Sequence, residues 1–154
     1  MKKLIAAIAL AVASLMPAVA SAGDHVQVGR LSCIVEPGIG LLFGSRKDVT
    51  CTFHPNSGSD QTFDGQITKV GLDIGITKRT RIEWLVFTAG DNNFDPDALA
   101  GRYVGASAEA SVVVGGGANW LIGGDHDSFM LQPWSGQAQI GLNLAVGLTG
   151  LRLY

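Results

Sequence analysis

Residues 103–114 read Tyr-Val-Gly-Ala-Ser-Ala-Glu-Ala-Ser-Val-Val-Val, a stretch in which apolar and polar side chains alternate. The more apolar face carries the even-numbered residues Val104, Ala106, Ala108, Ala110, Val112 and Val114. A period of two is typical of a half-buried β-strand. We therefore expect a strand whose Val104 face is buried. Because that face is mostly alanine, its packing partner must approach closely.

The same alternation extends along most of the chain. Further strands are predicted at His25–Val35, Asp48–His54, Phe63–Thr77, Thr80–Thr88, Trp120–Gly123, Phe129–Gln132 and Ile140–Tyr154. Changes of phase at Gly29-Arg30 and at Thr149-Gly150 indicate β-bulges, which bend a sheet toward closure. The sequence therefore predicts an all-β fold, a small antiparallel barrel or sandwich of about seven or eight strands.

One short helical turn is expected at Asp95–Gly101. Asp95 is suited to cap the first amides, Pro96 fits the first helical position, and Gly101 suits a left-handed terminating residue. This turn would connect two strands.

The N-terminal segment has the three parts of a secretory signal peptide: Lys2-Lys3, an apolar run from Leu4 to Met16, and the small residues Ala20-Ser21-Ala22. We expect residues 1–22 to be removed and residues 23–154 to form a single all-β domain. The apolar run is shorter than the roughly 20 residues of a membrane-spanning helix. We therefore expect a periplasmic or secreted protein with no membrane span in the mature chain.

A membrane-embedded barrel is the alternative, and two features of the chain argue against it. Eight strands of about 9–11 residues would use most of the mature chain and leave little for loops. In addition, Gly150 and Arg152 share the face of Tyr154, where a lipid-facing strand would carry apolar groups.

The amino-acid composition argues against two classes of protein, disordered chains and nucleic-acid-binding proteins. The 154 residues are 47% apolar and 16% charged, which excludes a disordered chain. Without Lys2 and Lys3, nine basic residues remain against 13 acidic ones, a formal charge of −4. The chain also has no cluster of lysines and arginines along the sequence, so we expect no nucleic-acid partner.

The cysteines are Cys33 and Cys51, each within a predicted strand. An even number of cysteines in an exported protein indicates a disulfide, here between two early strands. A metal pair or a reactive thiol is the alternative, but the CxxC spacing that either favours is missing.

An ordered set of short motifs resembles a known family. The motifs are the two cysteines, Gly38-Ile39-Gly40, Phe43-Gly44-Ser45, Gly71-Leu72-Asp73-Ile74-Gly75, Ala98–Tyr103, Gly117-Ala118-Asn119, Leu121-Ile122-Gly123-Gly124 and Leu131-Gln132-Pro133. The chain resembles small exported Gram-negative proteins catalogued as domain of unknown function number 992. The resemblance implies a secreted or periplasmic protein with no assigned activity and no catalytic residues to carry over.

A calcium site is one candidate, with Asp91, Asn93, Asp95 and Asp97 as alternating oxygen ligands. The pattern matches only the opening of an EF-hand loop, because Pro96 occupies the glycine position and the bidentate glutamate is missing. The alternative is a solvated loop that ends in the Asp95 cap. No other cofactor is expected.

Two further places in the sequence are candidates for a metal site or for acid–base chemistry. Asp125-His126-Asp127 could contribute to a zinc site with Asp24-His25 or His54, or could be an exposed hairpin tip. Glu83, in an apolar strand, could act in acid–base chemistry if buried, or could pair with Arg81 or Arg102.

No nucleophile elbow and no nucleotide-binding loop is present in the sequence, so we expect no enzyme. The favoured function is binding of an envelope component, a protein or a glycan. The alternative is a small-ligand carrier, since an eight-stranded barrel can hold one small molecule. Trp84, Trp120 and Trp134 are candidates for core anchors or for a surface contact.

Overall fold

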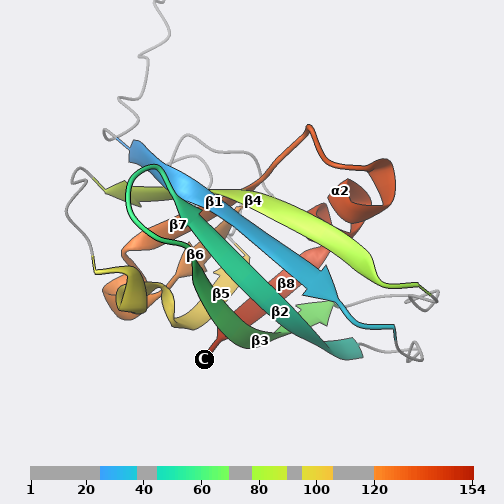
Figure 1. Cartoon of the computed structure of the whole chain (residues 1–154). Helices are drawn as coiled ribbons and strands as arrows, with labels where there is room; N and C mark the ends of the chain where they lie inside the picture. The colour runs from blue at the N-terminus through green and yellow to red at the C-terminus, as the bar shows by residue number, and fades with distance from the viewer. Residues whose placement is uncertain (1–24, 38–44, 70–77, 90–94, 106–119) are drawn as a thin grey trace, which may run out of the picture.

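The structure is a computed structural model that describes residues 25–37, 45–69, 78–89, 95–105 and 120–154. Its strands are β1 (His25–Val35), β2 (Ser45–Pro55), β3 (Gln61–Lys69), β4 (Thr80–Ala89), β5 (Gly101–Gly105), β6 (Leu121–Gly123), β7 (Phe129–Pro133) and β8 (Leu148–Leu153). They pair antiparallel and close into a barrel in the order β1-β2-β3-β8-β5-β6-β7-β4 (Figure 1). The predicted small antiparallel β-barrel is confirmed.

The barrel interior is filled by the inward side chains of these strands. The largest buried side chains are Trp84, Tyr103, Phe53 and Phe129, each at most 1% exposed. Burial of one such aromatic side chain stabilises the fold by roughly 1.5–3 kcal/mol. The ring of strands therefore encloses a packed core.

The predicted bulge in β1 is confirmed. The register between β1 and β4 shifts between Gln27 and Gly29. A Cβ atom added at Gly29 would lie 2.4 Å from the carbonyl oxygen of His54, so β2 approaches the bulge too closely for a side chain there.

The predicted orientation of the strand that begins at Tyr103 is wrong. Tyr103 is completely buried, whereas Val104 is 45% exposed. An aromatic ring buries more apolar surface than valine does, and the Tyr103 hydroxyl donates an internal hydrogen bond to the carbonyl oxygen of Leu99, 2.7 Å away. The remainder of this prediction, residues 106–114, lies outside the described residues, as do residues 70–77 of the strand predicted at Phe63–Thr77.

A second prediction, the strand from Ile140 to Tyr154, is wrong in its first half. Residues Gln139–Val146 form helix α2, and only Leu148–Leu153 form the strand β8. The helix buries Gly141, Leu144 and Ala145, and Leu148 continues the same helical spacing into β8. The bulge predicted at Thr149-Gly150 is confirmed, because Lys69 pairs with Leu148 and Thr68 with Gly150, which leaves Thr149 as the extra residue of β8.

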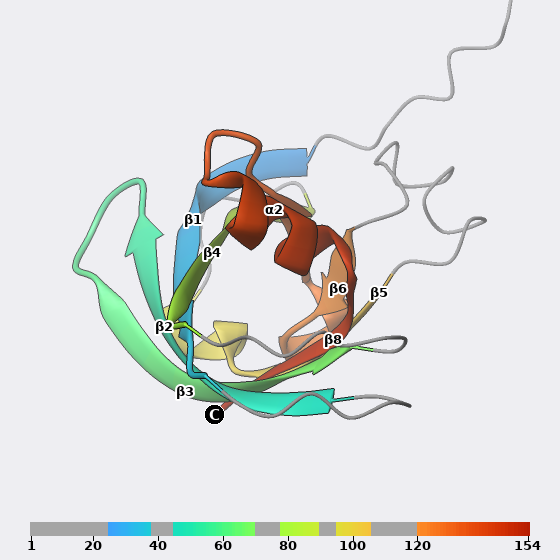
Figure 2. The same cartoon turned by 90° about the vertical axis from the view of Figure 1, so that its right-hand side faces the viewer.

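Helix α2 lies at one end of the barrel, where it contacts β4 and β7 (Figure 2). Gly141 allows the close approach, because a Cβ atom there would lie 2.1 Å from the carbonyl oxygen of Arg81. In the portion of the chain that is described, no helix combines the length and the apolar character needed to traverse a bilayer.

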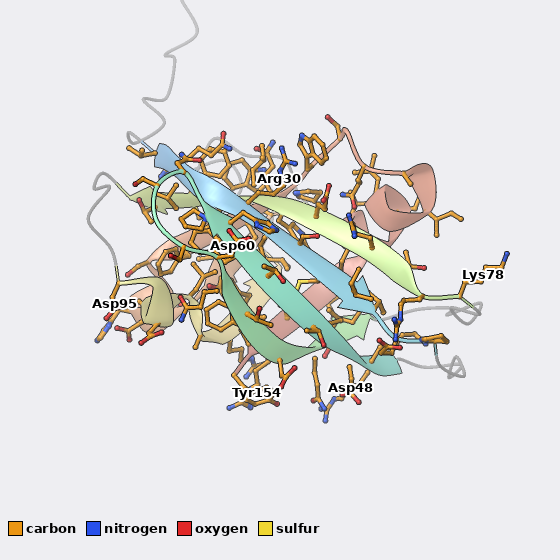
Figure 3. All side chains as sticks on the ribbon, in the orientation of Figure 1. Arg30, Asp48, Asp60, Lys78, Asp95 and Tyr154 are labelled. Carbon is orange, nitrogen blue, oxygen red and sulfur yellow. A yellow bond between two sulfur atoms is a disulfide. The ribbon has the colours of Figure 1, made fainter. Side chains whose placement is uncertain are left out.

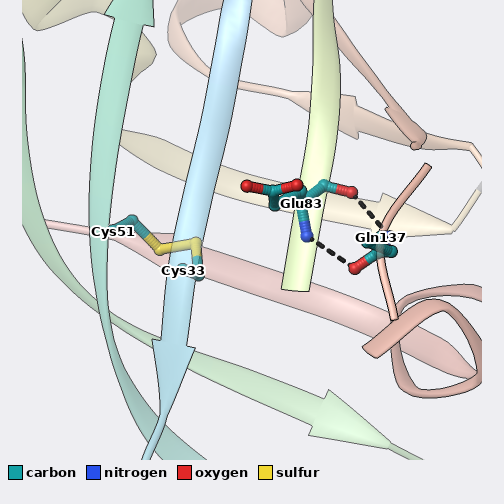
Figure 4. The surroundings of a disulfide bond; sticks show 4 residues. All are labelled: Cys33, Cys51, Glu83 and Gln137. Atoms are coloured by element: carbon teal, nitrogen blue, oxygen red, sulfur yellow. Dashed lines mark hydrogen bonds between the residues drawn. A yellow bond between two sulfur atoms is a disulfide. The ribbon is translucent and has the colours of Figure 1, made fainter. Parts of the chain in front are cut away.

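The Sγ atoms of Cys33 and Cys51 lie at bonding distance and form a disulfide inside the barrel (Figure 4). The two residues are direct partners in the register of β1 and β2, and both are completely buried. The predicted link between two early, neighbouring strands is therefore present in the structure.

Candidate functional site

The calcium candidate is only partly described. Asp91 and Asn93 lie outside the described residues. Asp95 is the N-cap of the 3-10 helix η1 (Pro96–Leu99), where its carboxylate accepts a hydrogen bond from the amide of Asp97 at 3.0 Å. The Asp97 carboxylate in turn accepts a hydrogen bond from the side-chain amide of Gln61. Both carboxylates therefore hold protein groups together, and the predicted helical turn with its Asp95 cap is confirmed. The predicted terminating role of Gly101 is wrong, because the C-cap is Ala100 in an extended conformation and Gly101 begins β5.

The zinc candidate forms a short 3-10 helix η2 (Asp125–Asp127) between β6 and β7. His126 contacts its neighbour Asp125 at 2.8 Å, and its side chain is 86% exposed. His54 instead contacts Asp60 at 2.8 Å. Across the described ranges, no group of three or more histidine, cysteine, aspartate or glutamate side chains comes together at metal-binding distance.

Glu83 takes part in the structure through its backbone (Figure 4). Its amide donates to the Oε1 atom of Gln137 at 2.9 Å, and the Gln137 Nε2 atom donates to the Glu83 carbonyl oxygen at 3.0 Å. The expected ion pair of Glu83 with Arg81 or Arg102 is not formed among the residues described. The Gln137 side chain thus pairs with β4 like one more strand residue and anchors the segment before α2.

The three tryptophans take different positions. Trp84 is fully buried in the core. Trp120, 8% exposed, stacks on Phe87 with ring centroids 5.4 Å apart. The guanidinium group of Arg30 lies 4.0 Å from the ring centroid of Trp134. One tryptophan is therefore a core anchor, and the other two make ring contacts with neighbouring side chains.

The most distinctive polar surface is a groove of about 330 Å³ on the outer face of β3, β8 and β5. We call it the arginine groove. Its lining comprises Arg46, Gln66, Thr68, Arg102, Tyr103, Val104, Thr149, Gly150, Leu151, Arg152 and Tyr154. Strand alternation explains this gathering, since residues two apart on a strand share one face of the barrel.

The arginines of the groove come from three strands: Arg46 from β2, Arg102 from β5 and Arg152 from β8. Arg102 and Arg152 are direct register partners. The Cβ atoms of such partners lie about 4.5–5.5 Å apart, and like charges at this position repel each other. Within the described chain, no carboxylate forms an ion pair with any of the three guanidinium groups. The groove therefore concentrates positive charge that the fold leaves uncompensated.

A glycine creates the depth of the groove. Gly150 of β8 lies in register between Thr68 of β3 and Val104 of β5. It carries no side chain, so the surface is hollowed beside Arg152. A Cβ atom added there would meet the Tyr103 carbonyl oxygen at 3.4 Å and the Thr68 Cβ atom at 3.8 Å, which are ordinary contact distances.

A second hollow of about 240 Å³ adjoins the first, and Gln66 and Tyr154 line both. Its acidic residues are Glu36, Asp48 and Asp64. In Figure 3, Asp48 and Tyr154 lie along the same edge of the barrel, far from Arg30. We call this second surface the acidic hollow. Positive and negative surfaces therefore meet at Tyr154.

Three contacts fix the boundary between the arginine groove and the acidic hollow. The Gln66 side-chain amide donates to the Asp48 carboxylate at 3.1 Å. The Tyr154 amide donates to the Asp64 carbonyl oxygen at 2.8 Å, and the Tyr154 ring centroid lies 5.5 Å from the Cζ atom of Arg152. Tyr154 as a whole residue is 61% exposed, so it lies at the boundary with much of its surface open to solvent.

The arginine groove was missed from the sequence because Arg46, Arg102 and Arg152 are about 50 residues apart along the chain. The signal available in the sequence was the alternation of side chains between the two faces of each strand. The sequence pattern puts Gly150 and Arg152 on the face of Tyr154, but its prediction of a buried Val104 face would turn Arg102 inward. The observed exposure of Val104 assigns Arg102 to the outer face of β5. Only the pairing of β5 with β8 brings these two faces together.

Comparison with known proteins gives a family but no activity. Residues 11–154 match the model of the family described as "Protein of unknown function (DUF992)", and the chain belongs to this family. The expected membership is thereby confirmed. No curated protein and no solved structure matches the chain significantly.

Proposed function

We propose that this member of the DUF992 family is an exported, non-catalytic domain that binds an envelope component, a protein or a glycan, through the arginine groove. The observation that carries the proposal is the register pair Arg102–Arg152, two cations without a carboxylate partner among the described residues. A bound anionic group would replace their mutual repulsion with charge-assisted hydrogen bonds.

Export is supported by two independent features. Residues 1–22 have the pattern of a secretory signal peptide. Cys33 and Cys51 lie at disulfide distance, and disulfides persist mainly in oxidising compartments such as the periplasm. Both features favour a periplasmic or secreted location.

A non-catalytic role is supported by the chemistry of the groove lining. The polar side chains there are arginine, threonine, glutamine and tyrosine. These groups bind anions and hydroxyls, whereas hydrolytic sites commonly combine a nucleophile with a histidine or carboxylate base. The lining described here contains no histidine, aspartate or glutamate side chain.

An outer binding face is also favoured over a carrier function. A carrier needs internal space, but Trp84, Tyr103, Phe53 and Phe129 occupy the described interior. We therefore place the ligand on the outside of the barrel.

The first experiment tests export. The full chain is expressed without a tag in a Gram-negative host, and the periplasmic fraction is released by osmotic shock. We expect the protein in that fraction with Gly23 as its first residue. Recovery in the cytoplasm with Met1 retained would contradict export.

The second experiment tests binding. The untagged product is sedimented with purified peptidoglycan sacculi and with lipopolysaccharide vesicles. We expect saturable retention by one of them that weakens at high salt and is lost in Arg102→Gln. Arg81→Gln removes a charge that is likewise exposed, from β4, and serves as the control. Equal retention of both variants, or no retention, would contradict the proposal for these envelope glycans.

A further inference from the structure

We propose that the ligand of the arginine groove is a phosphorylated sugar, with its phosphate over Arg102 and Arg152 and its sugar ring on Tyr154. The inference rests on the proposed binding function and adds the chemical class of the ligand. It uses three observations: the paired guanidinium groups, the exposed ring beside them, and the acidic hollow beyond that ring.

The phosphate position follows from the arginine geometry. Arg102 and Arg152 occupy directly paired positions of β5 and β8, so one anion bound between them can contact both side chains, and arginine binds tetrahedral oxyanions through paired donors. The cleared surface at Gly150 allows an anion to approach, with Thr68 and Thr149 as neutral hydroxyl neighbours in the same lining. A dianionic phosphate neutralises both cations, whereas a carboxylate neutralises one.

The sugar position follows from Tyr154 and the acidic hollow. Residue Tyr154 is 61% exposed and its ring lies next to Arg152, so a ligand bound by its phosphate there reaches the ring. Beyond the ring, Asp48 and Asp64 offer carboxylates, which accept hydrogen bonds from hydroxyl groups. A ligand that is anionic at one end and rich in hydroxyls at the other matches both surfaces.

The same acidic hollow disfavours a uniformly polyanionic ligand. Negative charge that extended past Tyr154 would meet Asp48 and Asp64, whereas Glu36 is already paired with Arg79 at 2.9 Å. Like-charge contact of this kind suppresses wrong partners. The groove volume of about 330 Å³ also lies at the small end of the range for ligand sites, which fits a single sugar unit.

Isothermal titration calorimetry of the mature protein, in a phosphate-free buffer of low ionic strength, tests this inference. The probes are glucose 6-phosphate, inorganic phosphate, glucuronate and glucose. We expect glucose 6-phosphate to bind most tightly, inorganic phosphate more weakly, and glucuronate and glucose weakest. Equal affinity for glucuronate and glucose 6-phosphate, or no binding of any probe, would overturn the inference.

Variants separate the two ends of the ligand. Arg102→Gln should weaken binding of both phosphate probes about 10-fold or more, since a charge-assisted hydrogen bond is removed. Tyr154→Ala should weaken glucose 6-phosphate but leave inorganic phosphate unchanged. Arg81→Gln should change neither, and an effect equal to that of Arg102→Gln would refute the assignment of the site.

Blocking the arginine groove with a side chain at Gly150 tests the ligand position without removing a charge. Gly150→Ala places a Cβ atom at ordinary contact distances, so the fold should tolerate it. Gly150→Leu extends a larger side chain into the groove and should abolish binding of glucose 6-phosphate. Binding that survives Gly150→Leu in a folded protein would contradict the proposed position of the ligand.

The outcomes distinguish this inference from the function on which it rests. Arg102-dependent retention on envelope material without selectivity for glucose 6-phosphate would leave the binding function standing and overturn the ligand class. Selective binding of glucose 6-phosphate without retention on envelope material would support the ligand class and overturn the envelope function.

Discussion

Removal of the Cys33–Cys51 disulfide should lower the stability of the barrel by a calculable amount. The two cysteines are 18 residues apart in sequence. The chain-entropy relation for a closed loop of this length gives a stabilisation of about 3 kcal/mol. For a domain of about 130 residues, with an unfolding entropy of about 2.1 cal/mol/K per residue, this corresponds to a fall in Tm of roughly 10 °C.

The assay is equilibrium unfolding in urea, with and without the reductant TCEP, followed by tryptophan fluorescence. Mass spectrometry confirms the oxidation state of each sample. We expect TCEP to lower the unfolding free energy of the native sequence by about 3 kcal/mol. The double variant Cys33→Ala/Cys51→Ala should be unaffected by TCEP. Coincident unfolding curves for the oxidised and reduced native sequence would refute the loop-entropy argument.

Three further predictions concern packing and hydrogen bonds. Gly141→Ala should destabilise the protein by more than about 1 kcal/mol, although alanine favours helices, because its Cβ atom would lie 2.1 Å from the Arg81 carbonyl oxygen. Thermal unfolding measures this, and an unchanged or higher Tm would contradict it. Gln137→Ala should cost about 1–3 kcal/mol in urea unfolding, because two hydrogen bonds to the β4 backbone are lost. A loss no larger than that of an exposed control, Lys78→Ala, would contradict this. Burial raises the pKa of Tyr103 above that of an unfolded tyrosine. The unfolded state therefore releases this proton first as the pH rises past about 10, and stability should fall there in the native protein but less in Tyr103→Phe. Urea unfolding at pH 9 and pH 11 tests this, and equal losses in both proteins would contradict it.

The fold class could be predicted because most strands alternate one apolar face with one polar face. The phase change at Gly29-Arg30 even located a true bulge. Helix α2 was missed because two patterns overlap there. Leu142, Leu144 and Val146 alternate like a strand, whereas Leu144, Ala145 and Leu148 have helical spacing. Ala138 at its N-cap offers no capping side chain, so the usual start signal of a helix is missing.

The candidate site could not be predicted for a different physical reason. Local motifs such as residues 91–97 attract attention because their polar groups are adjacent in sequence. The arginine groove depends on strand order instead, since β8 lies between β3 and β5. Arg102 and Arg152 become neighbours only through that pairing.

The place of β8 in the ring also determines when the barrel can be completed. Four pairs of neighbouring strands follow each other directly among the described elements: β1 with β2, β2 with β3, β5 with β6 and β6 with β7. Each pair can form once its second strand is available, because its contacts are local in sequence. β3 and β5 cannot be joined until residues 148–153 arrive between them. The seam between β3 and β5 is therefore closed by a strand that follows both of them in the chain, and a ligand that bridges Arg102 and Arg152 would hold β8 to β5.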